Sequence, residues 1–228
     1  MLKEIEGNCM KRILKLMLVL SMPHLVYADS ELHFSLKSGL NAATLDHEFR
    51  ANRYGFSGGA AGSLQRLFLG RFLLAGQIEF LYTPRGANVV FDGEKQAEFR
   101  EYYFDLVTVA RPGVQIGSAS VYLLLGGEVN FLMSADMENV SGSKQDTTGN
   151  LHRIDVALLG GAGVALHLPH QELGPFYLAT VFLEARHDVG LIDTDLANGG
   201  YKNRSSSLML GLSFGVGGTP APDKSPAK

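Results

Sequence analysis

Hydrophobic and polar residues alternate along eight segments of this chain. From Phe72 to Tyr82 every second residue is apolar or glycine, whereas Gln77 and Glu79 belong to the other set. Because successive side chains of a strand point to opposite faces, a period of two predicts a β-strand with one apolar and one mixed face. Similar alternation predicts strands at about 32–42, 54–64, 71–83, 101–111, 120–131, 153–168, 175–189 and 204–216.

The connections between these strands alternate between long and short. Long polar stretches lie at 44–53, 86–100, 134–152 and 190–203, and short ones at 65–69, 112–118 and 169–174. Bacterial outer-membrane barrels combine an even number of strands with short periplasmic turns and long extracellular loops. Strands of ten or more residues also match the tilted length that crosses a bilayer. The predicted fold is therefore all-β, an eight-stranded antiparallel up-and-down transmembrane β-barrel with apolar faces toward lipid.

The interior of such a barrel must accommodate charged side chains. Hydrocarbon offers no partner for backbone groups, so a sheet can cross only when it is closed, and eight strands leave room for little more than side chains. This argues against a wide diffusion pore. The alternation predicts a network of interior charges, and both a plug of salt bridges and a proton or ion path remain open, with the plug favoured. Its members are Lys37, Arg71, Glu79, Arg111, Glu128, Asp155, Glu184 and Arg186.

The first residues have the features of an export signal. A basic region ending at Lys15 precedes a short apolar run at 16–22, and the sequence Val26-Tyr27-Ala28 fits a cleavage site. We predict a secretory signal peptide at 1–28, a barrel at 29–217 and a disordered tail at 218–228. Cys9, the single cysteine, lies within the predicted signal, so no disulfide is expected in the exported protein.

Composition excludes several classes of function. The formal net charge of −3 becomes −5 once 1–28 are removed, because these residues hold four basic and two acidic side chains. Nucleic acid is therefore not an expected partner. The 27 glycines form no phosphate-binding loop, and the seven histidines have no metal-ligand spacing. We expect no cofactor, no metal and no catalytic residues.

Two alternatives to a non-enzymatic membrane barrel stay open at this stage. One is an outer-membrane lipid-modifying enzyme built from His187, Asp188 and either Ser205 or Ser207, although His187 and Asp188 are expected on opposite faces. The other is a soluble exported barrel that binds an apolar ligand, with the apolar faces turned inward. The exposed face of each strand distinguishes the two topologies.

Five segments of the chain resemble the PorT family of small outer-membrane β-barrel proteins. They are FSLKSGLNAATL (34–45), YGFSGGAAG (54–62), IEFLYTPRGA (78–87), LLGGEVNFL (124–132) and GLSFG (211–215). In the third of these, Arg85 stands where the family pattern has lysine. The resemblance spans nearly the whole chain after the predicted signal, and it implies a fold and a location but no reaction.

Together these patterns predict an outer-membrane protein with a structural or cell-surface interaction role. Its lumen is expected to be filled by side chains. Its expected partners are outer-membrane lipid and, through the loops, extracellular or envelope proteins.

Overall fold

The computed structural model describes residues 31–45, 50–68, 71–173, 176–193 and 201–216, and most of them lie in strands. A 3-10 turn, η1, spans Thr148–Asn150. The strands are β1 (Glu31–Leu45), β2 (Arg50–Phe68), β3 (Phe72–Phe91), β4 (Glu94–Ile116), β5 (Ala119–Asn139), β6 (Lys144–Asp146), β7 (Ile154–Leu173), β8 (Phe176–Gly190) and β9 (Asn203–Val216). No helix within these ranges has the length and apolar composition needed to cross a membrane.

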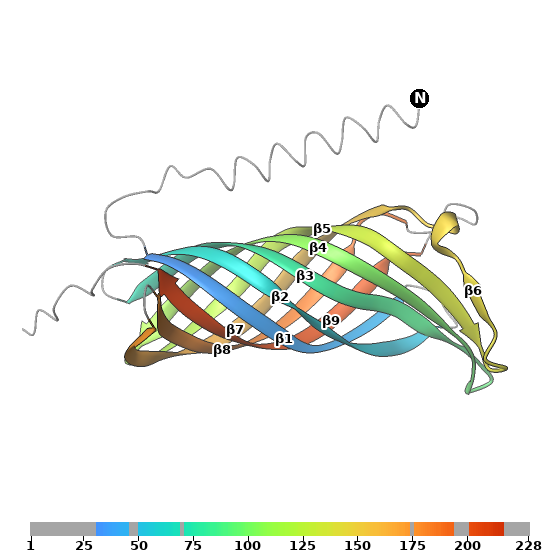
Figure 1. The fold of residues 1–228 in the computed structure, drawn as a ribbon, viewed down its shortest axis with the longest axis horizontal. Helices are drawn as coiled ribbons and strands as arrows, with labels where there is room; N and C mark the ends of the chain where they lie inside the picture. The colour runs from blue at the N-terminus through green and yellow to red at the C-terminus, as the bar shows by residue number, and fades with distance from the viewer. Residues whose placement is uncertain (1–30, 46–49, 69–70, 174–175, 194–200, 217–228) are drawn as a thin grey trace, which may run out of the picture.

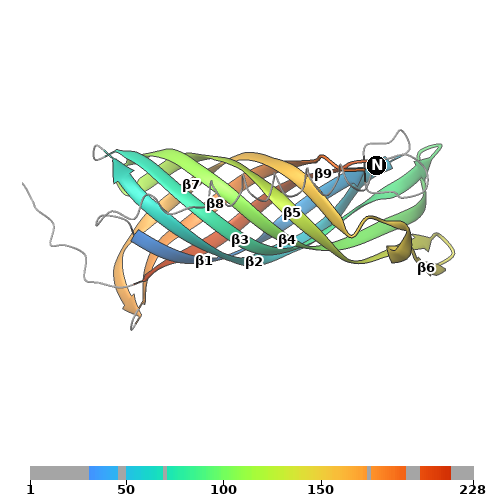
Figure 2. The same cartoon turned by 90° about the horizontal axis from the view of Figure 1, so that it is seen from above.

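Eight of these strands form a closed antiparallel cylinder. Each pairs with its neighbours in sequence, with β5 followed by β7, and β9 returns to pair with β1, where Phe34 lies opposite Phe214. The strands wind around a common axis in both views (Figure 1, Figure 2). The predicted eight-stranded up-and-down barrel is confirmed. The short strand β6 was not predicted, and it pairs with β5 outside the ring.

The apolar faces of the strands point outward. Ile78 and Phe80 are 41% and 49% exposed, whereas Glu79 between them is completely buried. The same alternation runs along β1, where Leu36 is exposed and Lys37 is buried. A soluble barrel with an apolar interior would have the opposite arrangement, so that alternative is wrong for this chain.

Two predicted loops are largely strand. The stretch 86–100 continues β3 and β4 to a tight turn at Asp92 and Gly93, which have φ angles of 51° and 80°. Residues with positive φ at both central positions suit a two-residue hairpin, which is why Asp-Gly is favoured there. Similarly, 134–152 contains the end of β5, all of β6 and η1.

These extensions make the barrel asymmetric. β3, β4 and β5 have 20, 23 and 21 residues, whereas β1 and β9 have 15 and 14. Their additional residues lie at the end that carries β6 (Figure 1). We call residues 84–91, 94–102, 134–139 and 144–146 the projecting sheet; its inner face, with Arg85 and Phe99, still borders the end of the lumen. We call the end that carries β6 the loop end. The short connections and the start of β1 lie at the opposite end, which we call the turn end.

Glycines on the inner face allow neighbouring strands to approach closely. A Cβ atom on Gly39 would overlap the backbone carbonyl oxygen of Leu208 on β9, and one on Gly126 would overlap that of Thr108 on β4. A Cβ on Gly62, in contrast, would meet no atom within 4 Å. Strands can therefore coil tightly where the inner positions carry no side chain.

The predicted signal peptide at 1–28 and the predicted tail at 218–228 lie outside the described residues. Their boundaries with the barrel remain predictions.

Candidate functional site

Eleven charged side chains of the described residues are buried, and they gather inside the barrel. Lys37 on β1 contacts Glu79 on β3 at 2.8 Å and Glu184 on β8 at 3.3 Å, although β1 and β3 are not neighbours in the ring. Arg186 makes two hydrogen bonds to Glu79, at 2.7 and 2.8 Å, and also pairs with Glu184. Such fork geometry satisfies both carboxylate oxygens of Glu79 at once.

Polar neighbours extend this group toward the turn end. Gln77 donates a hydrogen bond to Glu79 at 2.6 Å, and Arg111 donates one to Gln77 at 2.6 Å. The Arg111 guanidinium also lies 4.0 Å from the ring centre of Tyr122, a stacking distance. We call Lys37, Glu79, Arg111, Glu184 and Arg186 the turn-side cluster. Arg111 also lies 3.9 Å from Glu184, so every charge of this cluster has a partner of opposite sign and the cluster fills this part of the lumen with ion pairs.

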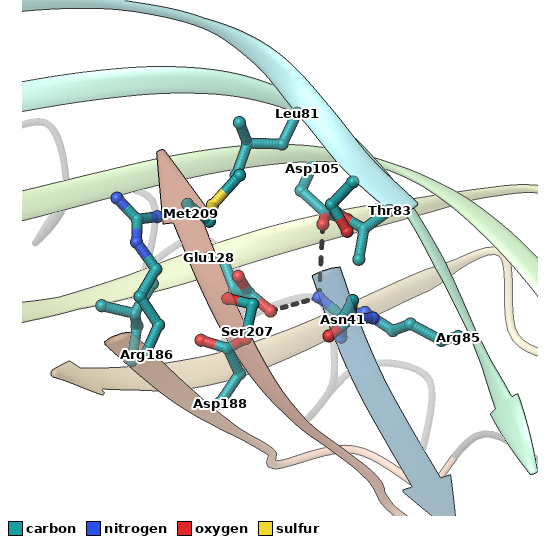
Figure 3. Close-up of a pocket in the computed structure, with 12 residues that line it drawn as sticks. Asn41, Leu81, Thr83, Arg85, Asp105, Glu128, Arg186, Asp188, Ser207 and Met209 are labelled. Carbon is teal, nitrogen blue, oxygen red and sulfur yellow. Dashed lines mark hydrogen bonds and ion pairs between the residues drawn. The ribbon is translucent and has the colours of Figure 1, made fainter. Parts of the chain in front are cut away.

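A second group lies nearer the loop end. Arg85 on β3 pairs with Asp105 on β4 at 3.3 Å and with Glu128 on β5 (Figure 3). Asp188 on β8 lies beside them and accepts a hydrogen bond from Ser205 at 2.8 Å. We call Arg85, Asp105, Glu128 and Asp188 the loop-side cluster. Here one base faces three acids.

Seven of the eight residues predicted for the interior network are buried in the lumen. They are Lys37, Glu79, Arg111, Glu128, Asp155, Glu184 and Arg186. Arg71 is the exception and requires a correction, because β3 begins at Phe72 and Arg71 lies exposed in the turn before it. The alternating pattern does not determine where the Arg71 side chain points, because Arg71 precedes the first residue of β3.

The sequence interpretation missed four buried charges: Arg85, Glu101, Asp105 and Asp188. Arg85 lies an even number of positions from Glu79, and Asp105 lies an even number from Arg111, so each pair belongs to one face of its strand. A signal was therefore present, but β3 was expected to end before Arg85, and only Arg111 was selected from β4. Extending the alternation through each full strand identifies these residues.

The loop-side cluster lines a small cavity of about 10 Å³, which is close to the least space that one water molecule requires (Figure 3). Asn41, Ser57, Thr83 and Ser207 add uncharged oxygen atoms to its wall. Asn41 uses its amide nitrogen to donate to the carbonyl oxygen of Pro84 at 2.7 Å. The cavity therefore combines carboxylates with neutral oxygen atoms in a space for one small occupant.

An apolar cluster closes the lumen on the loop side of this cavity. Phe99 and Tyr103 on β4 are 5% and 0% exposed and pack with aliphatic side chains from neighbouring elements. The cluster consists of Leu45, Ala87, Phe99, Tyr103, Leu132, Ala135 and Leu151, with Met137 and Tyr201 against it. Among the described residues, this apolar packing fills the lumen beyond the cavity.

The projecting sheet carries a separate ion network on its outer face. Arg100 donates to Glu98 at 2.9 and 3.2 Å and pairs with Glu138 at 2.6 Å. Arg53 and Lys95 also contact Glu98, at 2.9 and 2.7 Å. The hydrogen bonds from Arg100 lower the pKa of Glu98 well below its ordinary value, against a smaller opposing effect of burial.

This network predicts loosening of the projecting sheet in acid. Since the folded-state pKa of Glu98 is depressed, its contribution to stability is present above the unfolded pKa, about 4.3, and is lost as the pH falls below it. We expect faster amide hydrogen exchange in 94–102 at pH 3 than at pH 6, after correction for intrinsic exchange. Glu98→Gln should remove most of this difference and the exposed Glu94→Gln should keep it. Equal acid sensitivity in wild type and Glu98→Gln would contradict the assignment.

The residues of the hydrolase alternative are separated by the barrel wall. His187 Nδ1 lies 2.9 Å from Ser206 Oγ on the outside, whereas Asp188 accepts from Ser205 inside. A serine, a histidine and an acid that relay a proton must be in hydrogen-bond contact with one another. The described residues therefore do not assemble the proposed triad. They also contain no group of three or more His, Cys, Asp and Glu side chains placed to hold a metal ion.

Comparison with known proteins agrees with this architecture. A family model described as "Outer membrane protein beta-barrel domain" matches residues 23–196. The chain belongs to this family. Membership assigns this outer-membrane β-barrel protein to the bacterial outer membrane, and the outward apolar faces of its strands are those that lipid requires. No curated protein matches the chain.

Several solved structures share a distant similarity with this barrel protein. The attachment invasion locus protein Ail of Yersinia pestis, solved with the heparin analogue sucrose octasulfate, is 16% identical, with 82% of this chain and 99% of that chain covered and a TM-score of 0.42. Neisserial surface protein A is 14% identical, with 78% of this chain and 96% of that chain covered and a TM-score of 0.44. OprG of Pseudomonas aeruginosa is 10% identical, with 83% of this chain and 95% of that chain covered and a TM-score of 0.42.

Proposed function

We propose that this protein is a membrane-anchored surface-interaction protein in which the barrel serves as the anchor and the projecting sheet as the contact surface. The observation that carries the proposal is that the interior is occupied while the sheet extends well past the ring on one side. A filled interior leaves little space through which a solute could be transported. An extended sheet, in contrast, adds surface without adding to the closed cylinder.

The tip of the projecting sheet has the composition of a protein-binding surface. Phe91 at the β3–β4 turn is 57% exposed, and Val140 at the β5–β6 turn is 73% exposed. Val140 donates a backbone hydrogen bond to Gln96 at 3.2 Å, so the two turns are held together. Apolar side chains flanked by charged ones are typical of sites that bind other proteins. We infer that the partner is an extracellular or envelope protein.

The proposal requires the long connections to face the cell exterior. Single cysteines at Ser141, in the β5–β6 turn, and at Ser118, in the β4–β5 turn, test this orientation in a Cys9→Ser background. We expect a membrane-impermeant maleimide to label Ser141→Cys on intact cells and Ser118→Cys only after the outer membrane is opened. The reverse pattern would place the projecting sheet in the periplasm and overturn the proposal.

Binding itself is testable with the protein in lipid nanodiscs and an array of purified extracellular and envelope proteins. Replacing both Phe91 and Val140 by serine should weaken binding to the recognised partner at least tenfold. The matched control is Ile116→Ser, because Ile116 is 67% exposed at the turn end. The proposal fails if no array member binds, or if the tip and control variants bind equally well.

The filled interior predicts a very low electrical conductance. Planar bilayers containing the protein should show no stable open channel, because the turn-side cluster and the apolar cluster occupy the lumen. An eight-stranded barrel leaves an interior just wide enough for side chains. Regular conductance steps that persist in the purified protein would show an ion path and favour a channel function.

The assignment to the PorT family and the signal peptide are also part of this proposal. Membership of the PorT family is supported by the strand motifs around Gly39, Glu79 and Gly126. Export by a signal peptide is supported by the charge and apolar pattern of residues 1–28.

A further inference from the structure

The interior of the barrel contains more acids than bases. Within the described ranges, eleven buried side chains belong to Asp, Glu, Lys or Arg, of which four are basic and seven are acidic. The bases are Lys37, Arg85, Arg111 and Arg186, and the acids are Glu79, Glu101, Asp105, Glu128, Asp155, Glu184 and Asp188. Three carboxylates thus lack a matching side-chain charge. Uncompensated buried charges are strongly unfavourable, so the interior must acquire positive charge from another source.

The excess of acid is concentrated on the loop side of the lumen. The turn-side cluster holds three bases and two acids, so it has one positive charge in excess. Beyond it, Arg85 is the only base among the described buried residues, and it faces Asp105, Glu128 and Asp188 directly, with Glu101 and Asp155 farther along. The missing positive charge therefore belongs near the small cavity that the loop-side cluster lines.

Neutral oxygen atoms of this cavity independently indicate an occupant. Asn41 and Ser57 are 1% and 2% exposed and line the cavity. The Asn41 Oδ1 and Ser57 Oγ atoms have no hydrogen-bond partner among the described residues. One oxygen atom each of Asp105 and Asp188 is also without a hydrogen-bond partner in the part of the chain described. Buried polar atoms normally have partners, so these four oxygens point to an occupant that is either a hydrogen-bond donor or a cation.

We propose that this cavity binds one small monovalent cation, for which Na⁺ is the probe. Hard cations prefer carboxylate, amide and hydroxyl oxygens, and Asp105, Asp188, Asn41 and Ser57 provide all three kinds. The size of the cavity suits a single small ion without a hydration shell. A water molecule would fit the space but would compensate none of the excess negative charge, whereas one monovalent cation compensates one of the three unmatched carboxylates. The proposal is independent of the surface-interaction role.

Protons are the competing source of positive charge. The groups that face the cavity are Arg85 on β3, Asp105 on β4, Glu128 on β5, and Arg186 and Asp188 on β8. If a shared proton neutralised these acids, stability would depend on pH and not on the type of salt. The two explanations therefore give different results at constant ionic strength.

The test is thermal unfolding of the full protein in nanodiscs at pH 8, followed by circular dichroism in NaCl or in tetramethylammonium chloride. Tetramethylammonium is too large for a cavity of about 10 Å³. We expect a higher midpoint in NaCl, which increases by roughly 3–5 °C for each tenfold rise in Na⁺ above its dissociation constant. Equal midpoints in the two salts would overturn the proposal. If the midpoints are equal in the two salts and increase when the pH is lowered from 8 to 5, the positive charge comes from protons instead.

Variants assign the effect to this cavity. Asp105→Asn should abolish the difference between the two salts, whereas Asp136→Asn on the projecting sheet should retain it. Should Asp105→Asn not fold, Ser57→Ala keeps every charge and removes one oxygen ligand, and it should reduce the Na⁺ dependence at least severalfold. An unchanged Na⁺ dependence in Ser57→Ala, with wild-type circular dichroism, would place the ion elsewhere and overturn this site.

Discussion

Arg186→Gln is expected to destabilise the barrel by about 3–5 kcal/mol, because it removes one member of a buried ion network. Arg186 makes two hydrogen bonds to Glu79 and also pairs with Glu184. Without it, Glu79 keeps only Lys37 as an ionic partner, and the bidentate contact to its carboxylate is lost in a region closed to solvent. The free energy of unfolding in urea, measured in lipid vesicles, checks this expectation.

Arg71→Gln provides the matched control. Both arginines were predicted to lie in the lumen, but Arg71 lies exposed in the turn before β3. Exposed substitutions usually change stability by less than about 0.5 kcal/mol. Comparable losses from Arg71→Gln and Arg186→Gln would show that the interior network does not have the arrangement described.

Gly39→Ala is expected to have a comparably large effect at the β1–β9 seam. The added methyl group would overlap the carbonyl oxygen of Leu208, and backbone cannot move aside as a flexible side chain can. We expect a loss of about 3 kcal/mol or failure to form the compact band that migrates faster without heating, since overpacking alone costs about 1–3 kcal/mol. Gel mobility before and after heating measures the folded fraction.

Gly62→Ala should have the opposite effect on the stability of the barrel. A Cβ there meets no atom within 4 Å, and glycine within a strand is less stable than alanine by about 0.5–1 kcal/mol. Gly62→Ala should therefore stabilise the barrel slightly. A similar loss of the compact band in both variants would show that the tight approach at Gly39 is not the cause.

Most of the architecture could be predicted from residue alternation. The period of two places Ile78 and Phe80 on one face and Glu79 on the other, and the order of long and short connections distinguishes a membrane barrel from a sandwich. The limits of the strands were less predictable, because polar residues were interpreted as loop. Asp92-Gly93 after the apolar run at 89–91 is a hairpin signal that would have corrected the stretch 86–100.

The candidate site was only partly predictable for a different reason. Parity identifies which residues point inward, and it accounts for Lys37, Glu128 and Glu184. It does not show which of them meet, because Lys37 contacts Glu79 across the lumen from a strand that is not its neighbour. The cavity beside Arg85 is lined by residues from all eight strands of the ring, so no local pattern reveals it.

The pairing of the first ring strand with the last sets the order in which this protein can assemble. Phe34 lies opposite Phe214, so the cylinder cannot close until nearly the whole chain has been synthesised. Until then both terminal strands have unpaired edges, which promote aggregation. Such distant pairing also makes folding slow, since a long loop must be ordered before its contacts form. The newly made chain is therefore exposed to aggregation until its last strand pairs with its first.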